Sequence, residues 1–361
     1  MPPLPTIRTA LASLPTGPPL VAAFPGGTTG IGSYVVTALA RAFANHGSKL
    51  RVYVVGRNAV RADAVIAAGK RQSPGSEWRF IQATDLALIG EVDRCCAEIV
   101  RLETEAPFHG GQARLDLLYM SHCYPILKER STTKEGLDAF LSTTYYSRIR
   151  FITQLMPLLT ASPVPAHVIS IYAGGMEDGS AKPGELPIGL PPPATYGITT
   201  VRKHTCFMKT FLFEDLAAQH AGHLSLAHIF PGLVDGPTFY STDMPTWFRV
   251  VWRVVKPLAS WFMTSEDDCG DVMLYLATER YPAKGSVGNG GERKSLVGGV
   301  EVARSTDGEV GGGSYALGQR GDVQAKGVSY EKVRREGLGQ MVWDHTMESL
   351  GRIERDNARA E

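Results

Sequence analysis

The sequence predicts an α/β protein built on a doubly wound parallel sheet, and two observations support this class. Up to about residue 235, short apolar runs alternate with longer segments of helical period, which is the pattern of consecutive βαβ units. A glycine cluster, PGGTTGIG at 25–32, joins the first apolar run directly to the first helical segment. A helix that starts at the end of a buried strand offers unpaired N–H groups and a partial positive charge to a phosphate, so this junction predicts a nucleotide site.

Six apolar runs are the expected strands, and longer periodic segments separate them. The strands are expected at 20–24, 50–55, 78–83, 115–120, 167–172 and 224–230. The helices include segments at 33–46, 88–105, 136–159 and 329–354. Such a Rossmann-like sheet binds its ligands outside the carboxyl ends of its strands, so polar side chains just after each strand are the candidates for a site.

We expect three parts along the chain: an N-terminal extension over 1–19, a dinucleotide-binding catalytic domain over 20–282, and a Gly-rich hairpin with a C-terminal helix over 283–361. Within the domain, the aromatic and partly basic segment 237–265 is expected to form a lid over an apolar substrate. A membrane-surface contact, a dimer contact and plain core packing are the alternatives for this lid segment. Asp307 and Gly308, between short β-type runs, predict the hairpin.

Composition excludes several classes of function. With 361 residues, 43% apolar composition and a formal net charge of +1, the chain can bury a large core and has no bulk attraction to nucleic acid. Five cysteines without a CxxC predict neither a disulfide framework nor a zinc site, and no third ligand accompanies the His220–His223 pair. The proline-broken N-terminus predicts no leader, and no run reaches the roughly 18 apolar residues of a membrane span. We therefore expect a cytoplasmic enzyme without a metal.

The glycines of the cluster carry the first resemblance to a known family. Gly26, Gly30 and Gly32 fit G-x-x-x-G-x-G, which differs from the G-x-G-x-x-G of the archetypal dinucleotide fold. This form at this place resembles the short-chain dehydrogenase/reductase family. The resemblance implies that the turn binds the cofactor through its glycines and through three neighbours, namely Thr28, Thr29 and Ile31.

The ends of the next strands extend the resemblance. The second strand runs into VVGRN, which puts Arg57, followed by Asn58, near the adenosine ribose. A basic residue there favours NADP(H), because a guanidinium pairs with the 2′-phosphate. Asp85 and Leu86 resemble the family's pair beside the adenine ring. After the fourth strand, MSHC stands in place of the family's N-N-A-G. Its residues Ser121 and His122 are expected to border the nicotinamide pocket.

The resemblance continues past the sixth strand and covers about residues 18 to 282. In IFPGLVDGP, the family's P-G-x-V-x-T is matched at Pro231, Gly232 and Val234, while Gly236 stands in place of its threonine. A divergent branch common in filamentous fungi has similar stretches, which are in this chain VAAFPGGTTGIG, TTYYSRIRFITQLMPLL, HVISIYAGG, HTCFMKTFLFEDLA and DGEVGGGSY. Members of that branch often belong to secondary-metabolite pathways.

The catalytic pattern of the family is not kept. A typical member uses a Tyr-x-x-x-Lys pair, in which the lysine lowers the pKa of the tyrosine, together with a serine and an asparagine. Tyr196 is the natural tyrosine candidate, but Thr200 stands four residues later. Lys203 is seven residues on, which predicts the same helix face two turns away. Alignment without gaps from FLFEDLA instead places the pair on Gly197 and Val201.

The serine and asparagine positions are also replaced. HVISIYAGG puts Ser170 where the family often has asparagine and Ala173 where its catalytic serine stands, with Tyr172 as a candidate replacement. The helix asparagine becomes Tyr145, which is either an acid with a lowered pKa or, like Tyr146, a core aromatic residue.

Two further side chains near these positions have open roles. Arg148 either orients a carboxylate or enolate or is a solvated helix residue, and the second reading is preferred. His204 is either a general acid or a packed histidine, and again the second reading is preferred.

The leading hypothesis is an NADP(H)-dependent oxidoreductase that reduces a carbonyl or activated double bond of a mostly apolar, secondary-metabolite-like substrate. Tyr196 is the first candidate acid and Tyr145 the second. The alternative is a nucleotide-binding Rossmann-scaffold enzyme for a non-redox cyclisation, isomerisation or rearrangement, favoured by the missing Tyr-Lys pair. A catalytically silent subunit is a third reading. A homo-oligomer is compatible with the family, and no nucleic-acid partner is expected.

Overall fold

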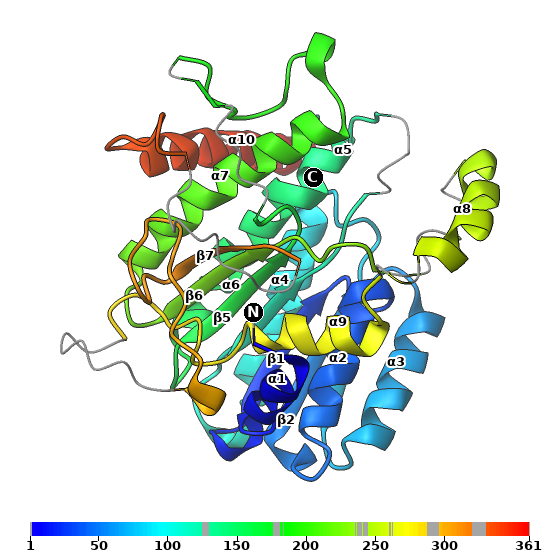
Figure 1. The fold of residues 1–361 in the computed structure, drawn as a ribbon. Helices are drawn as coiled ribbons and strands as arrows, with labels where there is room; N and C mark the ends of the chain where they lie inside the picture. The colour runs from blue at the N-terminus through cyan, green and yellow to red at the C-terminus, as the bar shows by residue number, and fades with distance from the viewer. Residues whose placement is uncertain are drawn as a thin grey trace.

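The computed structural model describes residues 2–124, 130–175, 181–182, 184–234, 236, 240, 245–259, 261, 263–286, 296–319 and 330–360. Parallel strands form one sheet in the order β3-β2-β1-β4-β5-β6-β7 (Figure 1). Their bounds are Leu20–Pro25 for β1, Leu50–Gly56 for β2, Glu77–Gln82 for β3, Leu117–Met120 for β4, Ala166–Ile171 for β5, Leu224–Ile229 for β6 and Ser314–Leu317 for β7. The strand order reverses between β1 and β4, which confirms the predicted doubly wound sheet.

The first six strands lie where the apolar runs predicted them, and the seventh was not predicted. β7 lies inside the segment 283–361, where only a hairpin and a helix were expected. It pairs in parallel with β6, from Leu226 opposite Ser314 to Ile229 opposite Leu317. Where the hairpin was expected, a single antiparallel bridge joins Arg304 to Val310 across the Asp307–Gly308 turn.

Helices cover both faces of the sheet, and each face has its own apolar core. One face carries α1 (Leu4–Leu11), α2 (Gly30–Ala42), α3 (Ala59–Gln72) and α9 (Glu266–Tyr275). The other carries α4 (Ile89–Glu105), α6 (Ser147–Thr160), α7 (Ile198–Gln219) and α10 (Leu338–Ala360). The segment 1–19 thus contributes a helix that packs on α9, and the last helix begins nine residues later than the sequence predicted.

Two segments depart from regular structure close to the carboxyl ends of the strands. The predicted helix at 136–159 is divided into α5 (Ala139–Leu141), a π-helical turn at Ser142–Tyr146, and α6. The chain also leaves the sheet after β6 and returns at a bridge between Val234 and Thr264. This excursion carries α8 (Thr246–Ala259), which stands apart from the layers in Figure 1. Parts of the predicted lid segment, at 237–239, 241–244, 260 and 262, lie outside the described residues.

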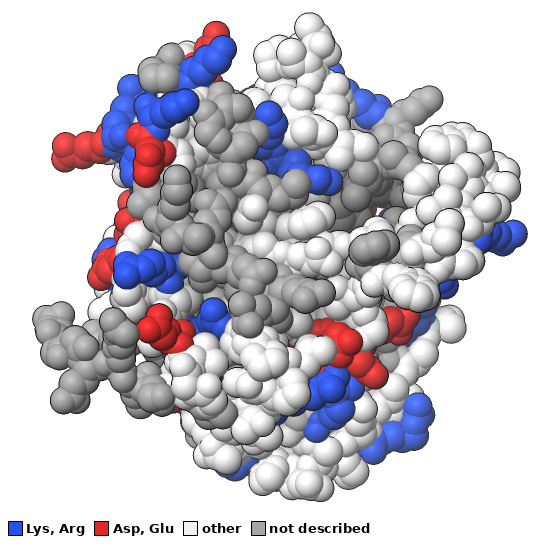
Figure 2. Space-filling view, in the orientation of Figure 1, with Lys and Arg blue, Asp and Glu red and all other residues white. Residues whose placement is uncertain are grey.

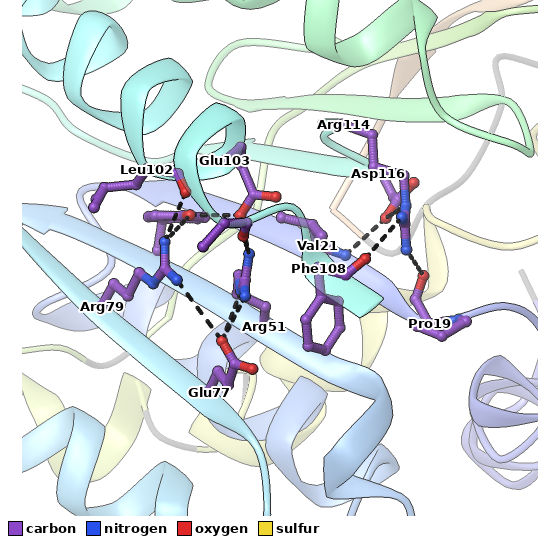
Figure 3. Close-up of polar contacts among 12 residues, drawn as sticks. Pro19, Val21, Arg51, Glu77, Arg79, Leu102, Glu103, Phe108, Arg114 and Asp116 are labelled. Atoms are coloured by element: carbon purple, nitrogen blue, oxygen red, sulfur yellow. Dashed lines mark hydrogen bonds and ion pairs between the residues drawn. The ribbon is translucent and has the colours of Figure 1, made fainter. Parts of the chain in front are cut away.

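A buried ion pair joins the outer strands to α4 (Figure 3). The Arg51 guanidinium donates to Glu103 at 2.8 Å, and Glu103 is fully buried. Arg51 also pairs with Glu77 at 2.7 Å and lies over the Phe108 ring. The Tyr53 hydroxyl donates to the same carboxylate oxygen of Glu103. The Arg51 charge on β2 is therefore compensated by Glu77 of β3, by Glu103 of α4 and by the Phe108 ring.

Replacing Glu103 by glutamine removes the buried one of the two carboxylates that pair with Arg51. We expect Glu103→Gln to lower the free energy of unfolding by about 3 kcal/mol, because the buried Arg51 then keeps only the exposed Glu77 as a charged partner. Urea denaturation followed by circular dichroism measures the change. Glu105→Gln is the control, since this exposed carboxylate pairs with Arg101 at the surface and should cost less than about 0.5 kcal/mol. Equal losses in the two variants would contradict the assignment.

Candidate active site

The glycine turn after β1 is packed directly against the end of β4. A Cβ on Gly26 would lie 2.5 Å from the backbone nitrogen of His122, and a Cβ on Gly32 would collide with Ser121 Oγ. Ser121 in turn donates its backbone N–H to the carbonyl of Pro25 at 2.9 Å. Neither glycine tolerates a side chain, and Gly26 also has a positive φ of 88°. The turn thus brings the predicted phosphate and nicotinamide residues together.

The N-terminus of α2 is open toward the space beyond the turn. Thr29 is the N-cap in an extended conformation, with no side-chain cap among the described residues and no acidic side chain in the first turn. A Cβ on Gly30 would meet no atom within 4 Å, whereas Thr28 is buried. Uncapped amide groups at a helix N-terminus fit a phosphate.

The end of β2 lies beside this turn. A Cβ on Gly56 would lie 2.5 Å from the Thr28 methyl carbon, so no side chain separates the two segments. Arg57 follows directly and is exposed. Asn58 accepts from the backbone N–H of Arg61 at 2.9 Å and caps α3. Arg57 is therefore exposed beside the glycine turn, while Asn58 has a structural use as the cap of α3.

The residues after β3 and β6 lie at the same edge of the sheet, where the parallel strands end. Asp85 is exposed and accepts from the backbone N–H of Ala87 at 2.9 Å, while Leu86 packs into the core. Gly232 has φ 74°, and a Cβ there would collide with Gln319, which follows β7. Val234 is buried, and Pro231 precedes it on the same strand end. All predicted cofactor residues therefore follow the carboxyl ends of strands or open the adjoining helix.

Ser170 holds two buried cations at the end of β5. Its hydroxyl oxygen accepts from the Arg148 guanidinium at 2.8 Å and from the Lys209 ammonium at 2.9 Å. Arg148 and Lys209 are both fully buried. The preferred reading of Arg148 as a solvated residue is therefore wrong: it also donates to the carbonyls of Thr143 at 3.0 Å and His122 at 2.7 Å. Burial lowers the pKa of Arg148 to about 10.

Lys209 was missed by the sequence reasoning, which sought a lysine close to Tyr196. It lies on α7 between the apolar residues of CFMKTFLF, and this burial pattern was the available signal. Besides Ser170, its ammonium donates to the carbonyl of Tyr172 at 3.1 Å and lies 5.3 Å from the centre of the Tyr172 ring.

The Tyr172 hydroxyl and His122 Nδ1 are buried and make no hydrogen bond of full geometry with the described residues, although Arg202 lies beside the first and the Pro25 backbone beside the second. Tyr172 follows β5, its hydroxyl is one of these atoms, and Arg148 lies 5.9 Å from its ring centre. Burial raises the pKa of Tyr172, and the cations of Arg202 and Arg148 oppose this effect. His122 bonds Ser147 Oγ through Nε2 at 2.8 Å, and its Nδ1 is the other such atom. Burial, assisted by the Arg148 charge, holds the pKa of His122 well below its ordinary value, so the ring is neutral.

Tyr196 does not lie on the helix that carries Lys203. α7 begins at Ile198, and Tyr196 precedes it in an extended conformation, so the predicted common helix face is wrong. The Tyr196 hydroxyl donates to Asp138 at 2.9 Å, and Arg130 lies 4.7 Å above its ring. Burial and then the hydrogen bond to Asp138 raise the pKa of Tyr196. The hydrogen bonds of Tyr196 and Ser170 therefore share no side chain. Asp138 accepts from the Tyr196 hydroxyl, whereas Arg148 and Lys209 donate to that of Ser170.

Tyr145 is a fully buried residue of the π-helical turn. Its hydroxyl lies 2.7 Å from Thr346 Oγ1 on α10, and its ring meets that of Tyr146 edge-on. Burial raises the pKa of Tyr145, which is the opposite of the lowering expected for an acid. His204 also makes a hydrogen bond within the protein, between its Nδ1 and the carbonyl oxygen of Gly189 at 2.9 Å.

Ser170→Ala should destabilise the protein, because both cations lose the same acceptor. We expect a loss of about 2–3 kcal/mol in the free energy of unfolding, as for hydrogen bonds to charged groups. Ser225→Ala is the matched control: this buried serine of β6 donates to the carbonyl of Tyr281, a neutral group, and its loss should cost about 1 kcal/mol. Thermal or urea unfolding measures both, and a Ser170 variant as stable as the Ser225 variant would contradict the charged contact.

The part of the chain that the structure describes contains neither a membrane-spanning helix nor a metal-binding cluster. No helix there is both long and apolar enough to cross a membrane. No group of three or more His, Cys, Asp or Glu side chains in those residues is arranged to hold a metal ion.

No protein-family model matches this chain. Named proteins, however, match almost its whole length. The chain is 59% identical over 358 residues to the short-chain dehydrogenase/reductase SAT2 of Stachybotrys chartarum, and the match covers 99% of each protein. It is 33% identical to oxidoreductase AN1596 of Emericella nidulans, with 96% of this chain and 97% of the relative covered. It is 31% identical to oxidoreductase andH of Emericella variicolor, with 92% and 91% covered.

Solved structures match the fold at low sequence identity. A complex of RhlG from Pseudomonas aeruginosa with NADP at its active site has a TM-score of 0.50 and 19% identity, covering 74% of this chain and 92% of that one. YwfH, an NADPH-dependent reductase involved in bacilysin biosynthesis, has a TM-score of 0.50 and 15% identity, covering 72% and 91%. At such identities the likeness supports the fold alone.

Proposed function

Since this chain belongs to the short-chain dehydrogenase/reductase family and is an oxidoreductase of that family, we propose that it uses NADP(H) to reduce a carbonyl or an activated double bond. The observation that carries the proposal is the contact of Gly26 and Gly32 with Ser121 and His122, next to an uncapped helix N-terminus. The proposed substrate is mostly apolar and secondary-metabolite-like. This class rests on the resemblance to the fungal branch.

The residues present fit a nicotinamide cofactor. The N-terminus of α2 would hold the pyrophosphate, and Arg57 would pair with the 2′-phosphate. His122, which lies beside the Pro25 backbone at the glycine turn, would border the nicotinamide. When bound, the reduced cofactor supplies the hydride, and the protein positions the substrate, excludes water and provides a proton.

Arg57→Ala should weaken NADPH binding by about tenfold to a hundredfold, the effect of one hydrogen-bonded charge pair. Binding of NADH, which lacks the 2′-phosphate, should change by less than about threefold. Quenching of tryptophan fluorescence in titrations with each cofactor measures the two constants. Arg61→Ala is the control, since Arg61 is also exposed and stands four residues further on, within α3. Unchanged NADPH binding, or an equal loss for both cofactors, would refute the preference for NADP(H).

For the proton donor we propose Tyr172, while Tyr196 and Tyr145 are the candidates that the sequence alone suggested. Burial raises the pKa of all three phenols, so the choice rests on their hydrogen bonds: the hydroxyls of Tyr196 and Tyr145 bond Asp138 and Thr346, whereas that of Tyr172, at the end of β5, lies beside the Arg202 cation and makes no hydrogen bond of full geometry with the described residues. When Tyr172 gives its proton to a developing alkoxide, the resulting phenolate would lie near the charges of Arg148 and Lys209. These two cations would act as positioning residues.

Tyr172→Phe should lower kcat by about 10²- to 10⁴-fold, the usual contribution of a positioned acid, with NADPH binding unchanged. Tyr196→Phe and Tyr145→Phe should each change kcat by less than about tenfold, since loss of a packed hydroxyl mainly affects stability. Consumption of NADPH with a panel of apolar ketones and enones measures the rates. A large loss in the Tyr196 variant with an active Tyr172 variant would return the role to Tyr196.

The missing Tyr-x-x-x-Lys pair favours one alternative, a non-redox cyclisation, isomerisation or rearrangement on the same scaffold. NADPH deuterated at the transferred position separates the two functions. Reduction carries deuterium into the product and consumes the cofactor. Formation of unlabelled product at constant NADPH would establish the alternative.

A further inference from the structure

The helix α8 exposes a stripe of large apolar side chains. Trp247, Val254 and Leu258 are 65%, 72% and 77% exposed. The stripe is completed by further exposed residues of the same helix, namely Val250, Val251 and Val255. Positions 247, 250, 251, 254 and 258 follow the i, i+3, i+4, i+7, i+11 spacing of one helix face. A continuous face of this kind on a folded protein indicates a surface that something apolar covers.

The stripe is distinct from the side of α8 that packs on protein. Trp252 is buried, and its ring stacks on that of Phe248 with the centroids 6.2 Å apart. Trp252 and Phe248 lie outside the i, i+3, i+4 series of the stripe. α8 therefore has an inner aromatic side and, next to it, an outer apolar side.

The excursion between β6 and α9 presents α8 away from the sheet. Val234 and Thr264 are bridged at its base, and the backbone N–H of Thr264 donates to the carbonyl of Leu233 at 3.1 Å. In Figure 1 α8 projects beyond the layers, and in Figure 2 it forms a broad white surface edged by blue basic side chains. A lid closed over the strand ends would instead bury this stripe.

The charges of α8 indicate which apolar partner covers it. Its residues 246–259 include Arg249, Arg253 and Lys256 and no acidic residue. A basic polar side opposite an apolar face with tryptophan suits a helix lying in the surface of an anionic membrane. A second copy packed on the apolar face would leave the basic sides outside the contact and so would give these charges no part in the binding. With 14 residues and about 1.5 Å per residue, α8 is shorter than a bilayer's hydrocarbon core, so it would lie in the surface without spanning it.

We propose that α8 docks the protein on anionic lipid membranes, with its apolar stripe in the headgroup and acyl boundary and its basic side chains at the lipid phosphates. This inference is independent of the reaction proposed above, because it uses only the exposed face and the charge of α8. Trp261, which follows the helix and is 89% exposed, would extend the contact.

Flotation of the full chain with vesicles tests the proposal. Vesicles of phosphatidylcholine alone and of phosphatidylcholine with phosphatidylglycerol are the probes. We expect stronger binding to the anionic vesicles, and a loss of about fivefold in that binding for each of Arg253→Gln and Lys256→Gln. The double variant Val254→Ser with Leu258→Ser should weaken binding by at least about tenfold.

Val60→Ser provides the matched control, because Val60 is an equally exposed valine (78%) on α3. It should leave vesicle binding unchanged, and thermal unfolding checks that every variant is folded. Absence of wild-type binding to anionic vesicles, or equal binding to neutral ones, would overturn the proposal. A dimer in sedimentation velocity that the Val254/Leu258 variant dissociates, without vesicle binding, would assign the face to a second copy and also overturn it.

Discussion

The contact between the glycine turn and the end of β4 is the constraint on which the candidate site depends. It lies where the strand order reverses, the place at which doubly wound sheets bind their ligands. Because Gly26 and Gly32 have no side chains, Ser121 and His122 reach the turn directly. The carbonyl of His122 then holds Arg148, and Arg148 holds Ser170. One series of contacts thus joins the phosphate end of the site to its chemical end.

Burial of Arg148 and Lys209 has an electrostatic consequence for this end. Burying two charges beneath the strand ends costs free energy unless polar groups surround them. Here backbone carbonyls, Ser170 Oγ and the face of the Tyr172 ring contact the two cations. The same charges favour a negative group that forms nearby during a reaction. They also explain why a neutral His122 is stable between strand and helix, since a second proton there would add a third charge.

The sequence predicted the parts of the fold that local pattern determines. Parallel strands buried on both faces are apolar and are followed by helical periodicity, so β1 to β6 and the glycine turn could be placed. β7 could not be placed, because SYAL is only four residues long and follows a run of glycines. It is a strand because it pairs with β6, which no local pattern indicates. The resemblance likewise located the cofactor side but not the acid. Tyr196 is held by Asp138, 58 residues earlier, and no local spacing reveals such a contact.

The place of β7 in the chain affects how the protein is made. During synthesis the outer edge of β6 has no neighbouring strand until Ser314–Leu317 has emerged, long after β6 itself. Until then a buried, apolar strand presents unpaired N–H and C=O groups, which are a template for pairing with other chains. Translation that stops between β6 and β7 would therefore leave an aggregation-prone product.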